Sequence, residues 1–281
     1  MTTPLRRRSL RARLQALITD ATGRITAAWR ILTTAQTRLL TALAAVRPGR
    51  TALAAIRAAT LAFQQALAAF DRAVAAFAAR WAATDLPAAY REGAYATLDH
   101  AGRPHRPWTW TGRHQGAITS LTAQYYADLM GRLAEALRRA RAFLRAALDA
   151  ARTRADRFSA ARFDRDLLQR EHPLGTVIYS GDARHPVESW ARAALSWQAV
   201  TTANAGAIRT AADELRCDWM EVRDGRDCGW TTHDDPDRAH GTLRTVQDAL
   251  AHSVAHPHCQ REFYPRPDII SRPDYAFGGP F

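Results

Sequence analysis

The most regular feature of the sequence is a heptad pattern of apolar residues in its N-terminal half. Apolar side chains recur at alternating intervals of three and four residues from Leu53 to Trp81, and Thr60 is the one polar member. This spacing is typical of an α-helix that packs one face along another helix. The seam positions are Leu53, Ile56, Thr60, Phe63, Leu67, Phe70, Val74, Phe77 and Trp81.

Two further stripes with similar spacing lie on either side of this seam. One runs from Leu10 to Val46, with one extra residue near Ala21, before Pro48 and Gly49 break the helix. The other runs from Tyr126 to Ala150. The sequence therefore predicts three long helices of roughly 30 to 45 residues each. Because many seam positions are alanine, which buries little surface, we expect the helices to pack closely in an elongated antiparallel bundle.

The segment between the second and third stripes predicts a shorter helix over 86–98 and then an ordered loop over 102–112. This loop contains Trp108 and Trp110 together with two prolines and two glycines. Tryptophan can stack on nucleic-acid bases, but an ordered loop beside a bundle more often packs its aromatic residues against the helices. We expect Trp108 and Trp110 to do the latter.

The pattern changes after Arg170. Residues 176–179 predict a short strand, 187–215 a helix, 217–222 a half-buried strand and 245–252 a short helix. The fold class is accordingly mainly α, an elongated bundle of long helices over 1–170 followed by a small α+β, loop-rich module over 171–267. A Pro- and Gly-rich tail over 268–281 completes the chain.

Charge divides the sequence in the same place. All 39 basic residues are arginine, and residues 1–170 hold 28 of them against 11 acidic residues, a net charge of +17. Residues 171–281 hold 11 arginines against 16 acidic residues, a net charge of −5. A basic helical region is suited to a polyanion such as DNA or to an acidic protein face, although solvated helix surfaces explain the charge equally well. The candidate contact residues are Arg6, Arg7, Arg8, Arg11, Arg13, Arg138, Arg139, Arg141 and Arg145.

Other features restrict the protein class. Charged or polar residues interrupt each apolar stretch, so we expect no membrane span and a soluble protein. The start of the chain lacks the compact apolar segment of a secretion signal. Three cysteines, Cys217, Cys228 and Cys259, are too few for a disulfide scaffold, which favours a reducing cytoplasm.

A group of cysteine and histidine residues in the C-terminal module is the main chemical candidate. Cys228, His233, His256 and Cys259 could supply the four ligands of a structural zinc ion. The alternatives are reduced cysteines with loop-capping histidines, or a disulfide between Cys228 and Cys259. We otherwise expect no cofactor.

The same region resembles the Mu F-like head morphogenesis proteins and the related type 2 minor capsid proteins of bacteriophages. The matching pieces are a helix over 191–215, a strand over 217–222, an Asp- and Cys-containing loop, and a His-Pro-x-Cys element. The motif residues are Asp224, Asp227, Cys228, His256, Pro257 and Cys259. Where family members often carry further cysteines, this chain has Thr231 and Arg261, which excludes a metal site of four cysteines.

The resemblance implies a low-copy structural protein of the phage head. Such a protein associates with the portal protein and other capsid proteins, assists head assembly, and accompanies DNA during packaging or ejection, so its location is the virion. Two other functions compete with this one. The crowded acidic residues and histidines of the 224–240 loop suggest a metal-dependent nuclease or toxin-type enzyme, although the turn-forming Pro236 and the absence of a known catalytic motif argue against catalysis. A coiled-coil scaffolding protein that never touches DNA is the third.

Overall fold

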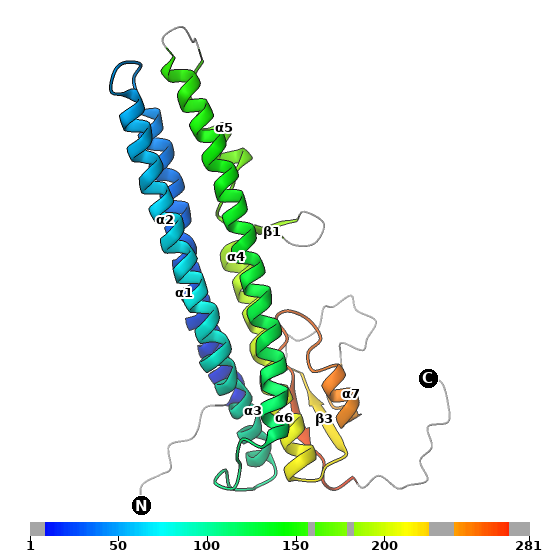
Figure 1. The fold of residues 1–281 in the computed structure, drawn as a ribbon. Helices are drawn as coiled ribbons and strands as arrows, with labels where there is room; N and C mark the ends of the chain where they lie inside the picture. Colours follow the sequence, from blue (N-terminus) through cyan, green and yellow to red (C-terminus); the bar gives the residue numbers. More distant parts are fainter. Residues whose placement is uncertain (1–8, 157–160, 179–182, 225–238, 270–281) are drawn as a thin grey trace, which may run out of the picture. The chain divides into compact units, whose positions relative to one another are not determined.

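A computed structural model describes residues 9–156, 161–178, 183–224 and 239–269 of the chain. Its described part is mainly helical, with long helices first and a small sheet-containing region towards the C-terminus (Figure 1). The fold class predicted from the sequence is therefore confirmed. The three long helices are α1 (Leu10–Ala44), α2 (Ala52–Arg80) and α4 (Gly112–Ala155), with 35, 29 and 44 residues.

The chain forms two compact units that interleave along the sequence. Unit 1 comprises residues 1–20, 81–125 and 193–281, and unit 2 comprises residues 21–80 and 126–192. This division differs from the predicted ranges 1–170 and 171–267. The physical reason is that α1, α4 and α6 (Val187–Glu214) each continue from one unit into the other.

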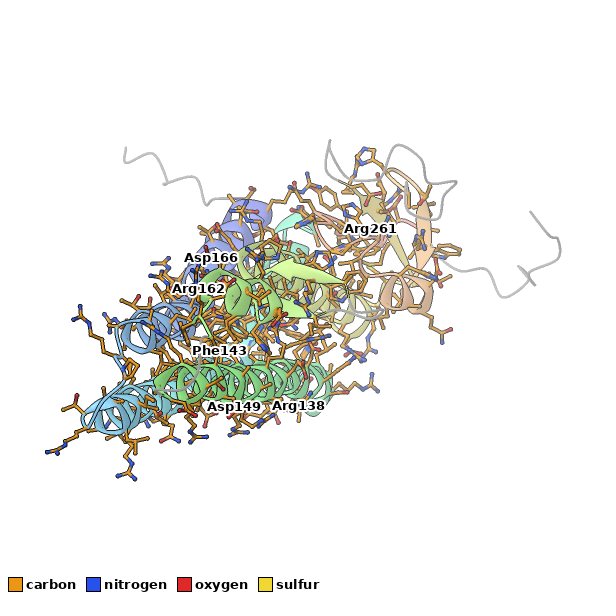
Figure 2. The ribbon with its side chains drawn as sticks, turned by 90° about the horizontal axis from the view of Figure 1, so that it is seen from above. Arg138, Phe143, Asp149, Arg162, Asp166 and Arg261 are labelled. Atoms are coloured by element: carbon orange, nitrogen blue, oxygen red, sulfur yellow. The ribbon has the colours of Figure 1, made fainter. Side chains whose placement is uncertain are left out.

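The core of unit 2 consists of the heptad seam of α2 and the facing sides of its neighbours. Trp29 meets the edge of Phe70 at a ring-centroid distance of 5.0 Å, and Phe63 lies 5.6 Å from Phe143 of α4. In Figure 2, Phe143 lies on the inner side of α4, whereas Arg138 and Asp149 lie on its outer side. These contacts are what a heptad seam with interspersed aromatic residues predicts.

Two seam residues behave differently from the prediction. Leu53 is 62% exposed, and the adjacent Ala52 is buried in its place. Tyr126 is 39% exposed and the adjacent Tyr125 is buried in its place. The predicted stripe on α4 is therefore shifted by one residue at its start.

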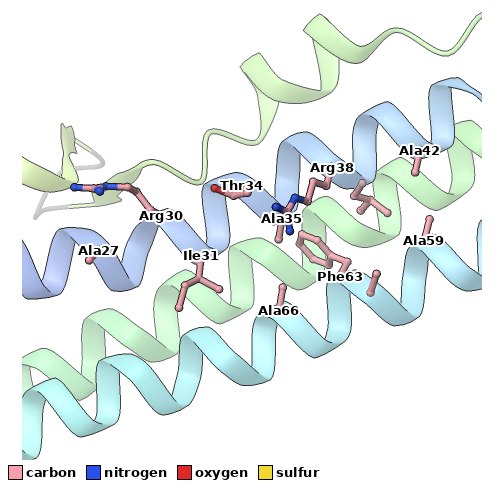
Figure 3. A pocket seen from close by; sticks show the side chains of 12 residues that line it. Ala27, Arg30, Ile31, Thr34, Ala35, Arg38, Ala42, Ala59, Phe63 and Ala66 are labelled. Atoms are coloured by element: carbon pink, nitrogen blue, oxygen red, sulfur yellow. The ribbon is translucent and has the colours of Figure 1, made fainter.

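A shallow groove runs between α1 and α2 in unit 2 (Figure 3). It comprises a hollow of about 490 Å³ and a second hollow of about 420 Å³, which share Ala27 and Ile31. Its floor is alanine, and Arg30 and Arg38 stand at the side of the larger hollow. Alanine leaves space between two helices that larger seam residues would fill. The residues that line the larger hollow are Ala27, Arg30, Ile31, Thr34, Ala35, Arg38, Leu39, Ala42, Ala59, Ala62, Phe63 and Ala66.

Three short elements complete unit 2. Helix α5 (Arg165–Glu171) begins after Asp164, whose side chain accepts a hydrogen bond from the backbone N–H of Leu167. Strands β1 (Thr176–Ile178) and β2 (Arg184–Pro186) then pair antiparallel. The strand predicted over 176–179 is thus present as one half of a hairpin.

The helix α2 does not end at Arg80 but continues through a π-helical turn, Trp81–Asp85, into α3 (Leu86–His100). Pro87 explains the turn, because its ring clashes with the carbonyl of the preceding helical turn and removes one hydrogen-bond donor. The indole Nε1 of the fully buried Trp81 donates to Oε1 of Gln198 at 2.7 Å. The separate short helix predicted over 86–98 is therefore the continuation of the previous one.

In unit 1, α3 and α6 approach so closely that each needs a glycine at the contact. A Cβ added to Gly93 would lie 1.8 Å from the carbonyl oxygen of Ala203. A Cβ added to Gly206 would lie 2.1 Å from the carbonyl oxygen of Tyr90. Both distances are far below van der Waals contact, so the two backbones meet directly.

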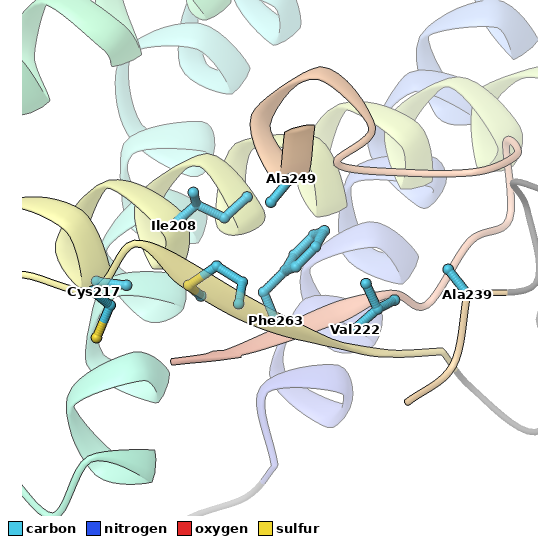
Figure 4. Close-up of a cluster of buried hydrophobic side chains, with 8 residues drawn as sticks. Ile208, Cys217, Val222, Ala239, Ala249 and Phe263 are labelled. Atoms are coloured by element: carbon cyan, nitrogen blue, oxygen red, sulfur yellow. The ribbon is translucent and has the colours of Figure 1, made fainter. Parts of the chain in front are cut away.

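A small three-stranded antiparallel sheet forms the C-terminal part of unit 1, in the order β4-β3-β5. Its strands are β4 (Leu243–Thr245), β3 (Trp219–Arg223) and β5 (Glu262–Pro265), and α7 (Val246–Ala251) follows β4 directly. Figure 4 shows the apolar core between the sheet, α6 and α7, with Val222 and Phe263 from the strands and Ile208 from α6. Cys217 belongs to this core as well.

One continuous helical run, Ala52–His100, contains a segment apolar enough to cross a bilayer by length and composition alone. Of its most apolar stretch, 28% is buried. Core helices of proteins outside membranes meet the same criteria, so this finding is weak evidence for a span.

Candidate functional site

The carboxylate at the end of β3 is held by an arginine 37 residues further along the chain. Asp224 accepts from Nε of Arg261 at 2.7 Å through Oδ1 and from Nη2 at 3.1 Å through Oδ2. The side chain of Arg261 is fully buried and that of Asp224 is 3% exposed. A buried, two-point pairing of this kind fixes both side chains, because either charge alone would be left without water.

Further hydrogen bonds extend this ion pair to the surrounding backbone. The backbone N–H of Ala239 donates to Oδ2 of Asp224 at 3.0 Å, and Nη1 of Arg261 donates to the carbonyl of His252 at 3.1 Å. Asn204 of α6 donates through Nδ2 to the carbonyls of Ser253 and Arg261, at 2.7 and 3.0 Å. Together these contacts link α6, the end of β3 and the segment before β5 around one buried polar centre.

The His-Pro-x-Cys element lies directly beside this centre. The backbone N–H of Cys259 donates to the carbonyl of His256 at 2.9 Å, which closes a tight turn through Pro257. The backbone N–H of Arg261 lies 3.4 Å from Sγ of Cys259. Cys259 is 1% exposed and His256 is 9% exposed. His256 and Cys259 are the buried members of this turn, Pro257 and His258 are exposed, and the Arg261–Cys259 contact joins the turn to the Asp224–Arg261 pair.

The predicted zinc set is only half within the described residues. Cys228, His233 and the motif residue Asp227 lie outside them. His256 and Cys259 share one turn, and they would provide two of the four ligands that structural zinc requires. Among the described residues there is no group of three or more histidine, cysteine or acidic side chains that could hold a metal. The zinc site stays a prediction.

Two of the predicted arginine contacts near the N-terminus are engaged inside unit 1. Arg11 donates through Nη2 to the carbonyl of Arg223 at 2.8 Å and forms an ion pair with Glu262 at 3.3 Å. Arg13 forms an ion pair with Glu92 at 2.6 Å. These two side chains tie the start of α1 to β5 and α3. Arg6, Arg7 and Arg8 lie outside the described residues.

The predicted contacts on α4 separate into one inward and three outward side chains. Arg139 donates to the carbonyl of Pro173 at 3.2 Å and to Oγ1 of Thr176 at 3.1 Å, and it also bonds the Thr176 carbonyl. Its guanidinium therefore holds the chain between α5 and β1. Arg138, Arg141 and Arg145 are exposed.

An aromatic centre in unit 1 has no counterpart among the predicted sites. The hydroxyl of Tyr90 lies 2.8 Å from Nδ1 of the fully buried His114, and Nε2 of His114 has no hydrogen-bond partner within the described residues. Burial lowers the pKa of His114 and raises that of Tyr90, so both groups are neutral at pH 7. Trp108 donates through Nε1 to Oγ1 of Thr210 at 3.1 Å, and Trp110 stacks on Tyr90.

This centre confirms that Trp108 and Trp110 pack on the helices. A lone histidine two residues after a Thr-Gly pair carries no signal for its burial, because the residues that enclose it come from α3 and α6.

Comparison with models of known protein families, with curated proteins and with solved structures finds no significant match to this chain.

Proposed function

We propose that this chain is a minor head protein of a bacteriophage, resembling the Mu F-like family in its C-terminal part. In this proposal it associates with the portal protein and other capsid proteins in the virion. It assists head assembly and the packaging or ejection of DNA, and it is a structural component and not an enzyme.

The observation that carries the proposal is the Asp224–Arg261 ion pair. The resemblance depends on pieces that are spread along the sequence: a helix, a strand, an Asp-containing loop and a His-Pro-x-Cys element. In the structure α6, β3, Asp224 and the His256–Cys259 turn pack around this one buried pair. The described parts of this motif make a single packed module, which supports the resemblance better than His-Pro-x-Cys alone, although Arg261 itself stands where family members often carry a cysteine and Asp227 and Cys228 lie outside the described residues.

The surroundings of Asp224 favour a structural role for this centre. Both carboxylate oxygens are used, one by Arg261 and the other by Arg261 and the Ala239 amide. A general base or a metal ligand needs an oxygen that faces the reacting group or the ion. Asp224 therefore supports the architecture of the module and is poorly suited to catalysis.

The proposal is tested on heads of the phage whose genome encodes this chain. Purified heads should contain the chain in far fewer copies than the major capsid protein. After gentle dissociation of the capsid shell, the chain should sediment with the portal. Absence of the chain from purified heads would overturn the proposal, as would a copy number equal to that of the capsid protein.

A further inference from the structure

Four arginines form a continuous ridge along the outer side of α4. At 100° per residue these positions lie on one helical face, opposite the buried Phe143 and Ala147. Figure 2 shows Arg138 and Asp149 on this outer side. We call this set the arginine ridge, and its members are Arg138, Arg141, Arg145 and Arg152, all of them exposed.

The ridge belongs to the unit that carries almost all of the excess positive charge. Unit 2 contains 21 arginines and 10 acidic residues, a net charge of +11. Unit 1 contains 18 arginines and 17 acidic residues, a net charge of +1. The acidic residues of unit 2 therefore do not balance its arginines, and the ridge lies in a positive electrostatic potential. Such a potential attracts polyanions.

The ridge arginines are only partly neutralised by nearby carboxylates. Arg138 pairs with Glu135, and Arg152 lies 3.6 Å from Asp149, with both side chains of the second pair more than 60% exposed. Arg141 and Arg145 form no ion pair with any described residue. Exposed pairs are weak, so a phosphate can displace the carboxylates with little loss.

The spacing of the ridge suits a phosphate backbone. At a rise of about 1.5 Å per residue, Arg138 and Arg152 lie about 21 Å apart along the helix axis. Neighbouring ridge members are separated by about 4 to 11 Å, which long arginine side chains can match to successive phosphates.

We propose that the arginine ridge of α4 binds the phosphate backbone of double-stranded DNA without reading its sequence. The guanidinium fork pairs with phosphate through two parallel hydrogen bonds. The ridge offers no asparagine or glutamine side chain for adenine edges, and the proposal assigns its arginines to phosphates, so binding should not depend on base sequence.

The composition of the surface favours DNA over a protein or a membrane. Between residues 127 and 155 of α4, all described, no large apolar side chain is exposed. A stable protein interface normally has an apolar or aromatic centre, and a helix on a membrane surface needs an apolar face. The exposed side chains of this stretch are arginines, small residues and the two aspartates Asp128 and Asp149.

This inference rests on the proposed function for its biological setting, because it assigns a surface to the DNA contact of a head protein. It is tested with the full-length chain and a fluorescent duplex of about 20 base pairs, by anisotropy over a series of salt concentrations. Removing three ridge charges in Arg138→Gln/Arg141→Gln/Arg145→Gln should lower the slope of log affinity against log salt by about 3, since each phosphate contact contributes about 0.9. Duplexes of different sequence should bind equally.

The matched control is Arg47→Gln/Arg57→Gln/Arg72→Gln, which removes the same charge from exposed positions of unit 2 on α2 and before it. This control should keep the salt slope of the parent chain to within about 1. Equal losses in the two triple variants, or no binding of duplex by the parent chain, would overturn the ridge proposal. If the chain still enters phage heads in that case, the proposed function stands and only the DNA surface falls.

Discussion

The guanidinium of Arg261 donates two hydrogen bonds to the carboxylate of Asp224, from Nε to Oδ1 at 2.7 Å and from Nη2 to Oδ2 at 3.1 Å, and the arginine side chain is fully buried. This pair joins the end of β3 to the segment that leads into β5. Asp224 lies 35 residues before Cys259 in the sequence, and the pair adjoins the His-Pro-x-Cys turn because the backbone N–H of Arg261 lies 3.4 Å from Sγ of Cys259.

Removing Asp224 should strongly destabilise unit 1. Asp224→Ala leaves the guanidinium of Arg261 buried without a counterion, which we expect to lower the free energy of unfolding by about 3 to 5 kcal/mol. The measurement is denaturant unfolding of the full chain followed by tryptophan fluorescence. Asp213→Ala, which removes a pair with the 76% exposed Arg113, is the control, and it should cost less than about 1 kcal/mol. Equal losses of unfolding free energy in the two variants would show that the buried pair stabilises the protein no more than the exposed pair does.

Filling the glycine contact between α3 and α6 should also be costly. In Gly206→Ala the new methyl group would lie 2.1 Å from the Tyr90 carbonyl oxygen, and the helices would have to separate. We expect a loss of about 3 kcal/mol in unfolding free energy, near the upper end for overpacking.

Gly116→Ala is the matched control for this substitution. Gly116 lies in α4 with nothing within 4 Å of an added Cβ, so the variant should gain about 0.5 to 1 kcal/mol from helix propensity. A neutral Gly206→Ala variant would mean that the two helices can move apart at no cost.

Burial of His114 should make unit 1 sensitive to mild acid. Burial lowers the pKa of His114 below its ordinary 6.5, against opposing contributions from Asp213 and Glu214. Between the lowered pKa and 6.5 the unfolded chain binds a proton that the folded chain does not. Stability therefore rises with pH in this window and is lost as the pH falls below 6.5, by at most about 1.4 kcal/mol per pH unit for one histidine.

The test compares unfolding free energies of the parent and His114→Phe at pH 7.5 and at pH 5.5. The variant should lose less stability on acidification, although some dependence should remain because burial also lowers the pKa of His100. An unchanged pH dependence in His114→Phe would assign the effect to other groups.

The same substitution at two adjacent arginines of α4 should change the stability of the protein by very different amounts. Arg139→Gln breaks the charged hydrogen bonds to Pro173 and Thr176, and we expect a loss of about 2 to 3 kcal/mol. Arg138, whose side chain is 66% exposed, should tolerate the change to glutamine within about 0.5 kcal/mol. Thermal melting followed by circular dichroism measures both, and similar melting temperatures for the two variants would contradict the assignment of Arg139 to the interior.

The zinc interpretation of Cys228, His233, His256 and Cys259 predicts about one zinc ion per chain after expression in zinc-rich medium. Cys259→Ser should abolish binding, whereas Cys217→Ser should not, because Cys217 lies in the apolar core between α6 and the sheet. Elemental analysis of the purified full-length chain measures both. Less than about 0.2 zinc per parent chain would exclude the site.

Periodicity predicted the long helices well because each of them has a continuous apolar stripe. The helix over 187–215 and the strands near 176 and 219 were also predicted to within a few residues. The join between α2 and α3 was not, because Pro87 signals a break in a sequence and the π-helical turn that accommodates it has no pattern of its own. Leu53 has a seam position, but Ala52 is the buried residue at this point of α2, which the repeat pattern does not indicate.

The candidate sites were less predictable, since their partners come from distant segments. Arg139 and Arg138 are adjacent and identical in the sequence, and only the position of Pro173 and Thr176 distinguishes them. In the sequence Arg261 is recognisable only as a departure from a cysteine pattern, and its pairing with Asp224 depends on how β5 returns beside β3. The division into interleaved units could not be predicted from the sequence, because every boundary lies within a helical segment and an irregularity in a helical stripe, such as the one near Ala21, does not by itself mark a unit.

The chain passes between its two units four times, after Asp20, Arg80, Tyr125 and Arg192, and each passage lies within a helical segment. Neither unit can therefore be excised by trimming the gene at a loop. Any fragment that isolates one unit has to cut helices in their interior, which leaves backbone N–H and C=O groups at the new helix ends without hydrogen-bond partners. A protease can cut at such a junction only after the helix has frayed, so digestion should begin elsewhere. The two units are therefore expected to be retained or lost together when the gene is rearranged.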